Sequence, residues 1–324
     1  MSLAPAPFPF IGSDDDYEGG TFVVHGDSIW LFGGIRDDEE YDYEMTDQVY
    51  KYDVAYRTWS EETPLSIEFV GFGIGGVSHD GWLYFTGFTD DEDWDNSFIR
   101  YNPDTGVTEL LSTPSEDFGG NGLITVPGSE NIYMALGSPD ARRYHVPTAT
   151  WHDDVSSNPA FYSPDSGLNE LYAVYDGEIV CSHLPNNFDF PVTPFPESTS
   201  MAVYNLAENT WRLLPELPVP ALGSTVFVLH GRLYAVGGRD SKTDDVTPIF
   251  TVDKTLYRLL GDESGWEVIE GKDMPASVPG LSFLDDAPWP PNYIYGVVDN
   301  KLILILSWFF RPENVELGTL AFVD

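Results

Sequence analysis

Arginine is the residue type in this chain best suited to bind an anion. Five arginines follow apolar, strand-like runs, most of them within a few residues of the run: Arg36, Arg142, Arg143, Arg239 and Arg311. A guanidinium group is planar and donates paired N–H bonds, so several of them together predict a site for a carboxylate or phosphate ligand. An alternative stays open, in which each arginine pairs with a neighbouring Asp or Glu and only relieves repulsion.

Acidic residues dominate the charge: 53 Asp and Glu stand against 15 Lys and Arg, a formal net charge of −38. Many lie in short runs, of which we call Asp37, Asp38, Glu39, Glu40, Asp90, Asp91, Glu92 and Asp93 the acidic rim. A solvated, mutually repelling surface explains such runs, and so does adaptation to high salt. The charge argues against nucleic acid and anionic membranes as partners, and it permits a basic protein.

The sequence predicts no cofactor. The acidic run that begins at Asp91 has Asn96 where a calcium loop of the helix-loop-helix type needs Gly, so it supports no such loop, although an irregular surface calcium site stays open. No nucleophile motif, phosphate-binding glycine loop or paired His is present. Cys181 is the one cysteine, which excludes an intramolecular disulfide and fits a small buried side chain.

Six repeats of about 50 residues organise the chain, a period typical of propeller blades. The strand cores centre on Ile29, Leu83, Ile132, Ile179, Leu233 and Leu302. Each repeat reads as four short strands bounded by turn residues, which predicts an all-β fold with six antiparallel blades. The expected blades cover approximately residues 17–64, 70–114, 118–155, 160–215, 222–270 and 280–324, and residues 5–11 are expected to close the ring as the missing strand of the sixth blade.

The connections between the second and third strands should all emerge on one face of such a propeller. They are residues 35–47, 88–97, 138–143, 183–200, 239–250 and 308–316, and they contain both the five arginines and the acidic rim. The arginines stand nearer the preceding strands, so we expect an inner ring of guanidinium groups surrounded by carboxylates.

The chain resembles the kelch-repeat family over nearly its whole length. The family pattern is a strand ending in Gly-Gly, then a spaced Tyr and a spaced Trp, here seen as Gly33-Gly34, Tyr52 and Thr58-Trp59 and again as Gly237-Gly238. The resemblance implies a β-propeller whose second-to-third-strand loops form a ligand platform. Kelch copper oxidases need a Tyr–Cys crosslink, and iron-dependent kelch lyases need a carboxylate four residues before a His; neither pattern is present.

His25, His79 and His230 are expected to occupy one repeat position beside a hairpin turn, where a structural role is expected. We therefore expect a single propeller domain, residues 1–324, that is a binding platform for a protein or small-molecule ligand. The alternative is a non-redox propeller enzyme, isomerase-like or lyase-like, acting on a small anionic or sugar substrate. The absence of a signal peptide, a disulfide and an Asn-x-Ser/Thr acceptor favours a cytoplasmic location. We also expect a monomer.

Overall fold

The computed structural model describes most of the chain, and the residues pack into two compact units. The described residues are 20–37, 43–71, 75–89, 95–114, 122–136, 141–156, 170–183, 201–218, 225–236, 239–244, 247–252, 255–269, 292–298, 301–307 and 317–320. Unit 1 comprises Met1–Thr125, Tyr144–Trp151 and Pro291–Asp324, and unit 2 comprises Val126–Arg143 and His152–Pro290. Each unit is described by itself.

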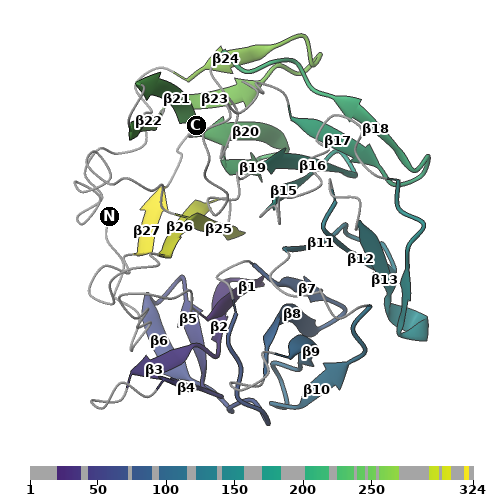
Figure 1. The fold of residues 1–324 in the computed structure, drawn as a ribbon, viewed down its shortest axis with the longest axis vertical. Coiled ribbons are helices and arrows are strands. Elements are labelled where there is room, and N and C mark those ends of the chain that lie inside the picture. Colours follow the sequence, from purple (N-terminus) through teal and green to yellow (C-terminus); the bar gives the residue numbers. More distant parts are fainter. Residues whose placement is uncertain are drawn as a thin grey trace. The chain divides into compact units, whose positions relative to one another are not determined.

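Five four-stranded antiparallel sheets, which we call blades 1 to 5, can be followed in Figure 1. Blade 1 is β1 (Thr21–His25), β2 (Ser28–Phe32), β5 (Val49–Asp53) and β6 (Thr58–Glu61), and blade 2 is β7 (Val77–His79), β8 (Trp82–Phe88), β9 (Asn96–Tyr101) and β10 (Thr108–Leu111). Blade 3 is β11 (Leu123–Thr125), β12 (Asn131–Met134), β13 (Arg142–His145) and β14 (Thr150–His152), with a 3-10 turn, η1 (Val146–Thr148), before its last strand. Blade 4 is β15 (Glu170–Tyr175), β16 (Glu178–His183), β17 (Ala202–Asn205) and β18 (Thr210–Leu213), and blade 5 is β19 (Thr225–Leu229), β20 (Arg232–Val236), β23 (Leu256–Leu259) and β24 (Trp266–Val268).

The prediction of an all-β propeller with four-stranded blades is confirmed, but the predicted number of six such blades is wrong. Among the residues that the structure describes there are five, and the sixth repeat forms a three-stranded sheet of β25 (Asn292–Val298), β26 (Lys301–Ser307) and β27 (Leu317–Leu320). The sixth repeat has no Thr-Trp strand of its own, which accounts for the difference. Residues 5–11, expected to supply that strand, lie outside the described residues.

Two kinds of turn shape each blade, and both depend on positive φ angles. The turns between the first and second strands contain Asp80-Gly81, Asp176-Gly177 and His230-Gly231, with φ between +47° and +78°, as hairpins of this type require. His230 is therefore a turn residue that follows the end of β19, whereas His25 and His79 end their strands. The expectation that the three histidines share one position is wrong by one residue for His230.

The turns between the third and fourth strands close on an Asx side chain. Asp53 Oδ1 accepts from the backbone N–H of Tyr56 at 2.8 Å, and Asn205 Oδ1 accepts from Glu208 at 2.9 Å. The residue before the Thr of each Thr-Trp pair has a positive φ, +51° at Ala149 and +53° at Asn209. These turns reverse the chain and set the register in which the fourth strand, with its Trp, pairs with the third strand.

The hydrophobic cores lie between consecutive blades. In unit 1, side chains of blades 1 and 2 pack together, and Phe32 and Phe85 stack with ring centroids 4.3 Å apart. In unit 2, blades 4 and 5 share a core of mostly aliphatic side chains that includes Val180, Val226 and Leu233. A single blade buries little surface alone, so this packing between blades supplies most of the hydrophobic stabilisation.

A repeated hydrogen bond also joins consecutive blades. The indole Nε1–H of Trp151 donates to the Ser112 carbonyl at 2.7 Å, and Trp211 and Trp266 donate in the same way to Ser156 and Pro215 at 2.7 and 2.8 Å. Each acceptor follows the fourth strand of the preceding blade. In blade 2 the Trp position is Thr108, and the Tyr101 hydroxyl donates to the Thr63 carbonyl at 2.9 Å instead.

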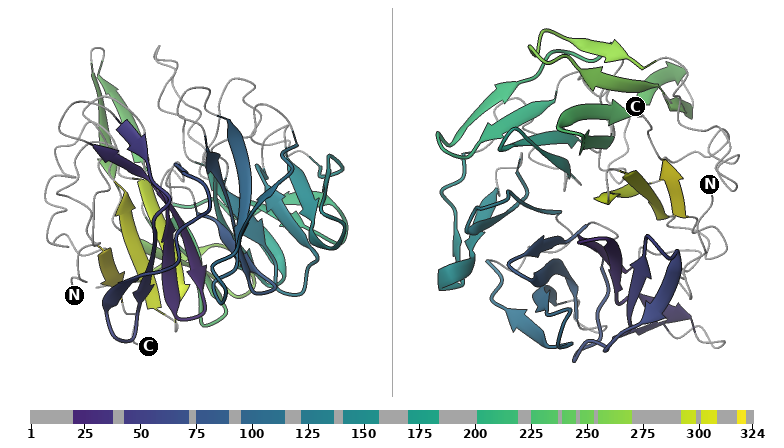
Figure 2. Two further views of the ribbon diagram at one scale, coloured as in Figure 1. Left: turned by 90° about the horizontal axis from the view of Figure 1, so that it is seen from below. Right: turned by 180° about the vertical axis from the view of Figure 1, so that it is seen from behind.

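Two antiparallel ribbons extend the connections between the second and third strands of blades 1 and 5. One is β3 (Ile35–Asp37) paired with β4 (Tyr43–Met45), and the other is β21 (Arg239–Asp244) paired with β22 (Thr247–Val252). Figures 1 and 2 show both as strands additional to their four-stranded sheets. In the described part of the chain, no helix is long and apolar enough to cross a membrane.

Candidate functional site

The predicted arginines fall on three kinds of element. Arg36 lies in β3 and Arg239 in β21, so both belong to the ribbons and not to irregular loops. Arg142 and Arg143 are the first two residues of β13, the third strand of blade 3. Arg311 lies outside the described residues. The structure describes the side chains of Arg142 and Arg143 only, so the predicted anion site as a whole stays a prediction.

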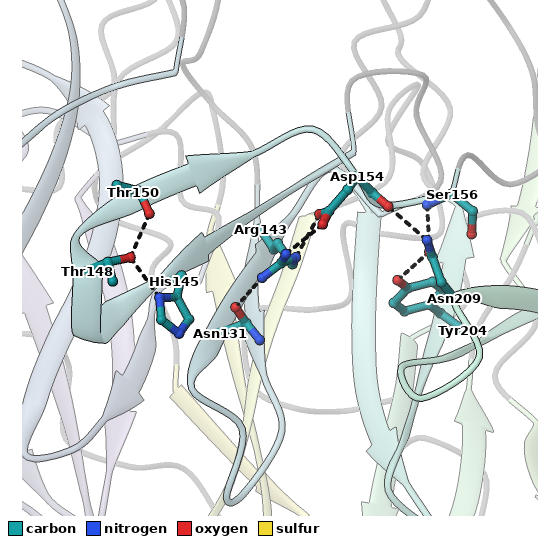
Figure 3. Close-up of polar contacts among 9 residues, drawn as sticks. All are labelled: Asn131, Arg143, His145, Thr148, Thr150, Asp154, Ser156, Tyr204 and Asn209. Atoms are coloured by element: carbon teal, nitrogen blue, oxygen red, sulfur yellow. Dashed lines mark hydrogen bonds and ion pairs between the residues drawn. The ribbon is translucent and has the colours of Figure 1, made fainter.

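Arg142 and Arg143 both pair with carboxylates that follow β14. Figure 3 shows the pair that Arg143 makes with Asp154. Arg143 binds Asp154 with two parallel hydrogen bonds, from Nε to Oδ1 at 2.7 Å and from Nη2 to Oδ2 at 2.6 Å. Its Nη1 donates to Asn131 Oδ1 at 2.9 Å. Arg142 Nε lies 3.1 Å from Asp153 Oδ1. An anionic ligand at Arg143 would therefore compete with Asp154 for the same guanidinium edge.

The pairing changes the acid strength of Asp154. The hydrogen bond from Arg143 holds the pKa of the Asp154 carboxyl below its ordinary value, because it stabilises the charged form. Burial raises the pKa of Tyr204, in the same region, to about 12. Both groups keep their usual charge near neutral pH, Asp154 ionised and Tyr204 neutral, so this cluster holds structure and has no group poised to exchange a proton.

Asn209 joins this cluster to blade 4, as the right side of Figure 3 shows. Its Oδ1 accepts from the Tyr204 hydroxyl and from the backbone N–H of Ser156, both at 2.8 Å. Its Nδ2 donates to the Asp154 carbonyl at 2.8 Å. All of these atoms belong to unit 2, where Asn209 fixes the exit of blade 3 against the last turn of blade 4.

His145 forms a second polar group on the turn of blade 3. Its Nδ1 lies 2.7 Å from Thr148 Oγ1, which lies 2.7 Å from Thr150 Oγ1 (left side of Figure 3). These contacts stay within the turn around η1, and they give His145 a structural role.

Sequence reasoning missed a cation that recurs at one repeat position. The cation lies in the third strand, directly before the Tyr position of the repeat. It is Lys51, Arg100, Arg143 and Arg258 in blades 1, 2, 3 and 5. Arg100 and Arg258 pair across to the fourth strand, with Glu109 and Glu267.

Three of these four cations lie opposite aromatic residues of the second strand. The register pairs Trp30 with Lys51, Tyr84 with Arg100 and Tyr234 with Arg258. Lys51 Nζ lies 5.4 Å from the centre of the Trp30 ring. A basic residue immediately before the Tyr position was visible in the sequence, and superimposing the repeats would have found it.

Blade 4 departs from this pattern. Its second and third strands pair Val180 with Val203, and the cation stands on the fourth strand as Arg212. Arg212 donates to Glu178 at 2.7 Å and to Glu263, in the last turn of blade 5, at 2.6 Å. The arginine therefore joins two consecutive blades within unit 2.

The acidic rim is described at one position. Asp37 is the last residue of β3, and the rest of the rim lies outside the described residues: Asp38, Glu39, Glu40, Asp90, Asp91, Glu92 and Asp93. In the part of the chain that the structure describes, no group of three or more His, Cys, Asp or Glu side chains could hold a metal ion. The expectation of a cofactor-free protein stays a prediction.

The fold is that of a β-propeller, because consecutive four-stranded meanders pack against each other within each unit, through aromatic side chains in unit 1 and mainly aliphatic ones in unit 2. Gly33 illustrates the close approach: its φ is +63°, and a Cβ there would overlap the Phe69 carbonyl.

Comparison with known proteins finds Kelch-like relatives. Human Kelch-like protein 15 is 24% identical over 275 residues, which covers 78% of this chain and 42% of that protein. The Kelch-like protein terF of Aspergillus terreus is 23% identical over 259 residues, 80% of this chain and 47% of that protein. The chain spans less than half the length of these curated relatives. No family model matches the sequence. The repeat pattern, the β-propeller fold and these Kelch-like relatives are consistent with the kelch-repeat family.

Proposed function

We propose that this chain is a kelch-type binding platform, and that the blade ends bearing the ribbons carry the contact surface for a protein or small-molecule ligand. The observation that supports this most is the pair of ribbons, β3–β4 on blade 1 and β21–β22 on blade 5. Each adds backbone to a blade that is complete without it. Segments added to a rigid scaffold in this way are where binding residues usually lie.

The ligand chemistry follows from the arginines of these ribbons. Arg36 in β3 and Arg239 in β21 bring cations to an otherwise acidic protein. Guanidinium groups at such places attract carboxylate or phosphate groups even against the overall field. We therefore propose an anionic group on the ligand, and a basic partner at the acidic rim as the alternative.

The proposal includes a cytoplasmic, monomeric protein whose partner is another protein or a small molecule. The net charge of −38 supports the exclusion of nucleic acid and anionic membranes, since it repels both.

Charge-reversal at the ribbon arginines tests the proposal. The double variant Arg36→Glu/Arg239→Glu should weaken an anionic ligand by about 2 kcal/mol or more, roughly thirtyfold. The probe is a panel of citrate, inorganic phosphate and an octaglutamate peptide, measured by titration calorimetry. Arg57→Glu/Arg232→Glu is the matched control, because it reverses the same number of charges at exposed positions of the same two blades, in the β5–β6 turn and at the start of β20, at the ends opposite to the ribbons. Equal loss in both variants, or no binding of any probe, would reject the anionic-ligand proposal.

A further inference from the structure

The ribbon of blade 5 prolongs the two middle strands of the blade past the described end of the first strand. The β20–β23 ladder reaches the pair Val236–Leu256, and the β21–β22 ladder continues from Arg239–Val252. The pairing of β19 with β20 stops at Val236. Among the described residues, β21 pairs with β22 and with no other strand. The edge that β19 covers within the blade therefore continues along β21 without a described partner.

Blade 2 shows what the same edge does within this protein. The second strand, β8, runs past the last pair that it forms with β7, and its final residue is Phe88. Phe88 pairs with Asn96 of β9 on one side and, antiparallel, with Val70 on the other. The Val70 N–H donates to the Phe88 carbonyl at 3.0 Å, and the Phe88 N–H donates to the Val70 carbonyl at 2.8 Å. A second strand that outruns the first thus takes up an extended segment by backbone hydrogen bonds.

Pro248 indicates which edge of the blade 5 ribbon can take up a longer segment. Proline has no N–H, so it fits a position of β22 at which the N–H would point away from β21. This direction alternates along an antiparallel ladder, so Ser241 and Thr243 turn their backbone N–H and C=O groups to the free edge of β21. The two-residue connection between Asp244 and Thr247 gives the same phase, because such a hairpin closes on a hydrogen-bonded pair. The edge of β21 has all of its donors, whereas the edge of β22 lacks one.

We propose that the edge of β21 binds an extended segment of a partner protein, which adds as an antiparallel strand and places a carboxylate side chain opposite Arg239. Lys242 shares its face of the ribbon with Asp240 and Asp244, which leaves Arg239 as the cation that selects charge. Main-chain hydrogen bonds hold an added strand, and its alternate side chains give specificity. The inference rests on the proposed function, because it gives the blade 5 ribbon its class of ligand.

The test selects peptides from a phage-displayed library of random octapeptides on the full wild-type chain and resynthesises them with a fluorescein label. Fluorescence anisotropy gives their affinity for the wild type, Ser241→Pro and Ser241→Ala. Proline removes one donor from the edge of β21, whereas alanine keeps the N–H and removes only the hydroxyl. Arg239→Gln examines the charge. Melting curves establish that each variant is folded.

A second measurement leaves the protein unchanged. Each peptide is made in two further forms, with N-methyl groups on one or the other set of alternate residues. Only one set of backbone groups in an added strand faces β21. One methylated form should therefore lose binding, and the other should keep it within about threefold.

Ser241→Pro should weaken binding about tenfold or more, and Ser241→Ala less than about twofold. Equal losses in these two variants, equal losses in the two methylated forms, or a library that yields no peptide sensitive to Ser241→Pro would overturn the proposal. Selected peptides that lack a carboxylate, or that bind Arg239→Gln as well as the wild type, would reject the match to Arg239. Loss of peptide binding on removal of the ribbon, without a loss in Ser241→Pro, would reject strand addition and leave the ribbon as the platform.

Discussion

The junction between blades 1 and 2 and the junction between blades 4 and 5 solve one packing problem with different chemistry. The first is aromatic: Phe32, Phe69 and Phe85 contact one another, with Phe69 and Phe85 edge to face at 5.1 Å. The second is built mainly of Val, Leu, Met and Ala side chains. It adds the ion pairs of Arg212 with Glu178 and Glu263.

The backbone contact across each junction is nevertheless the same. In both, a ring donor reaches a carbonyl that follows the fourth strand of the preceding blade: the Tyr101 hydroxyl to Thr63, and the Trp266 indole to Pro215. The comparison teaches that the repeat fixes this hydrogen bond, while the side chains around it are free to vary. The ribbons can then differ between blades because the junctions hold the blades in place.

The largest expected effect is on the cores. Phe85→Ala should destabilise the protein by about 3–5 kcal/mol, because it opens a large cavity in the aromatic junction. Val226→Ala removes fewer atoms from the aliphatic junction and should cost about half as much. Urea unfolding of the two variants checks this. Equal losses in the two variants would mean that a single side chain contributes as much stability at the aliphatic junction as at the aromatic one.

A smaller effect is expected at the repeated hydrogen bond. Tyr101→Phe and Trp266→Phe each leave a carbonyl without its donor, which should cost about 1–2 kcal/mol for the hydrogen bond itself. Trp266→Phe also removes part of a ring, so its loss should be the larger of the two. Thermal unfolding measures both. A variant as stable as the wild type would show that the hydrogen bond at that junction contributes nothing.

The smallest effect concerns the charged contacts, for which the junction of blades 3 and 4 offers a third case. The folded-state pKa of Asp154 is lowered by Arg143, so the stability from this pair is present above the ordinary carboxyl pKa of 3.8 and is lost as the pH falls through the folded value. Asp154→Asn should cost less than about 1 kcal/mol near pH 7, because the side chain is largely exposed.

The difference between Asp154→Asn and the wild type should shrink below about pH 4, where the carboxyl of the unfolded chain becomes protonated and, at lower pH, that of the folded protein. Unfolding at a series of pH values measures it. Glu68→Gln, exposed and without a recorded ion pair among the described residues, serves as the control. A difference that stays constant down to pH 2 would contradict the pairing with Arg143.

Much of the blade architecture could be predicted from the sequence because it depends on local signals. The hairpin turns at Asp80-Gly81 and Asp176-Gly177, and the Trp near the start of the fourth strand in four of the five blades, are set by residues adjacent in the chain. The ribbons were missed because three-residue strands such as β3 carry almost no periodic signal and form only by pairing across a loop. His230 was misaligned because each of these hairpin turns has two residues, and the Gly is the first of them in Gly26-Asp27 but the second in His230-Gly231.

The candidate site was predictable only in part. Arg142 and Arg143 were identified as anion-binding candidates, yet their partners Asp153 and Asp154 follow the next strand, a proximity that depends on the sheet. The sequence alone also left the pairing of Arg212 with Glu263 unseen, because the two residues belong to different blades. The order of charged residues along the chain does not reveal which of them form ion pairs in the folded structure.

The central claim, that the ribbons carry the binding surface on rigid blades, is tested most directly by removing them. One variant replaces residues 36–44 by a Gly-Asn-Gly linker, and the other replaces residues 240–251 in the same way. The affinity of each variant is measured for a partner protein that the wild-type chain captures from a lysate of its native organism. The expected result is a loss of about tenfold or more in at least one variant, with a melting temperature within a few degrees of the wild type. Affinities within about twofold of the wild type in both variants would contradict the claim.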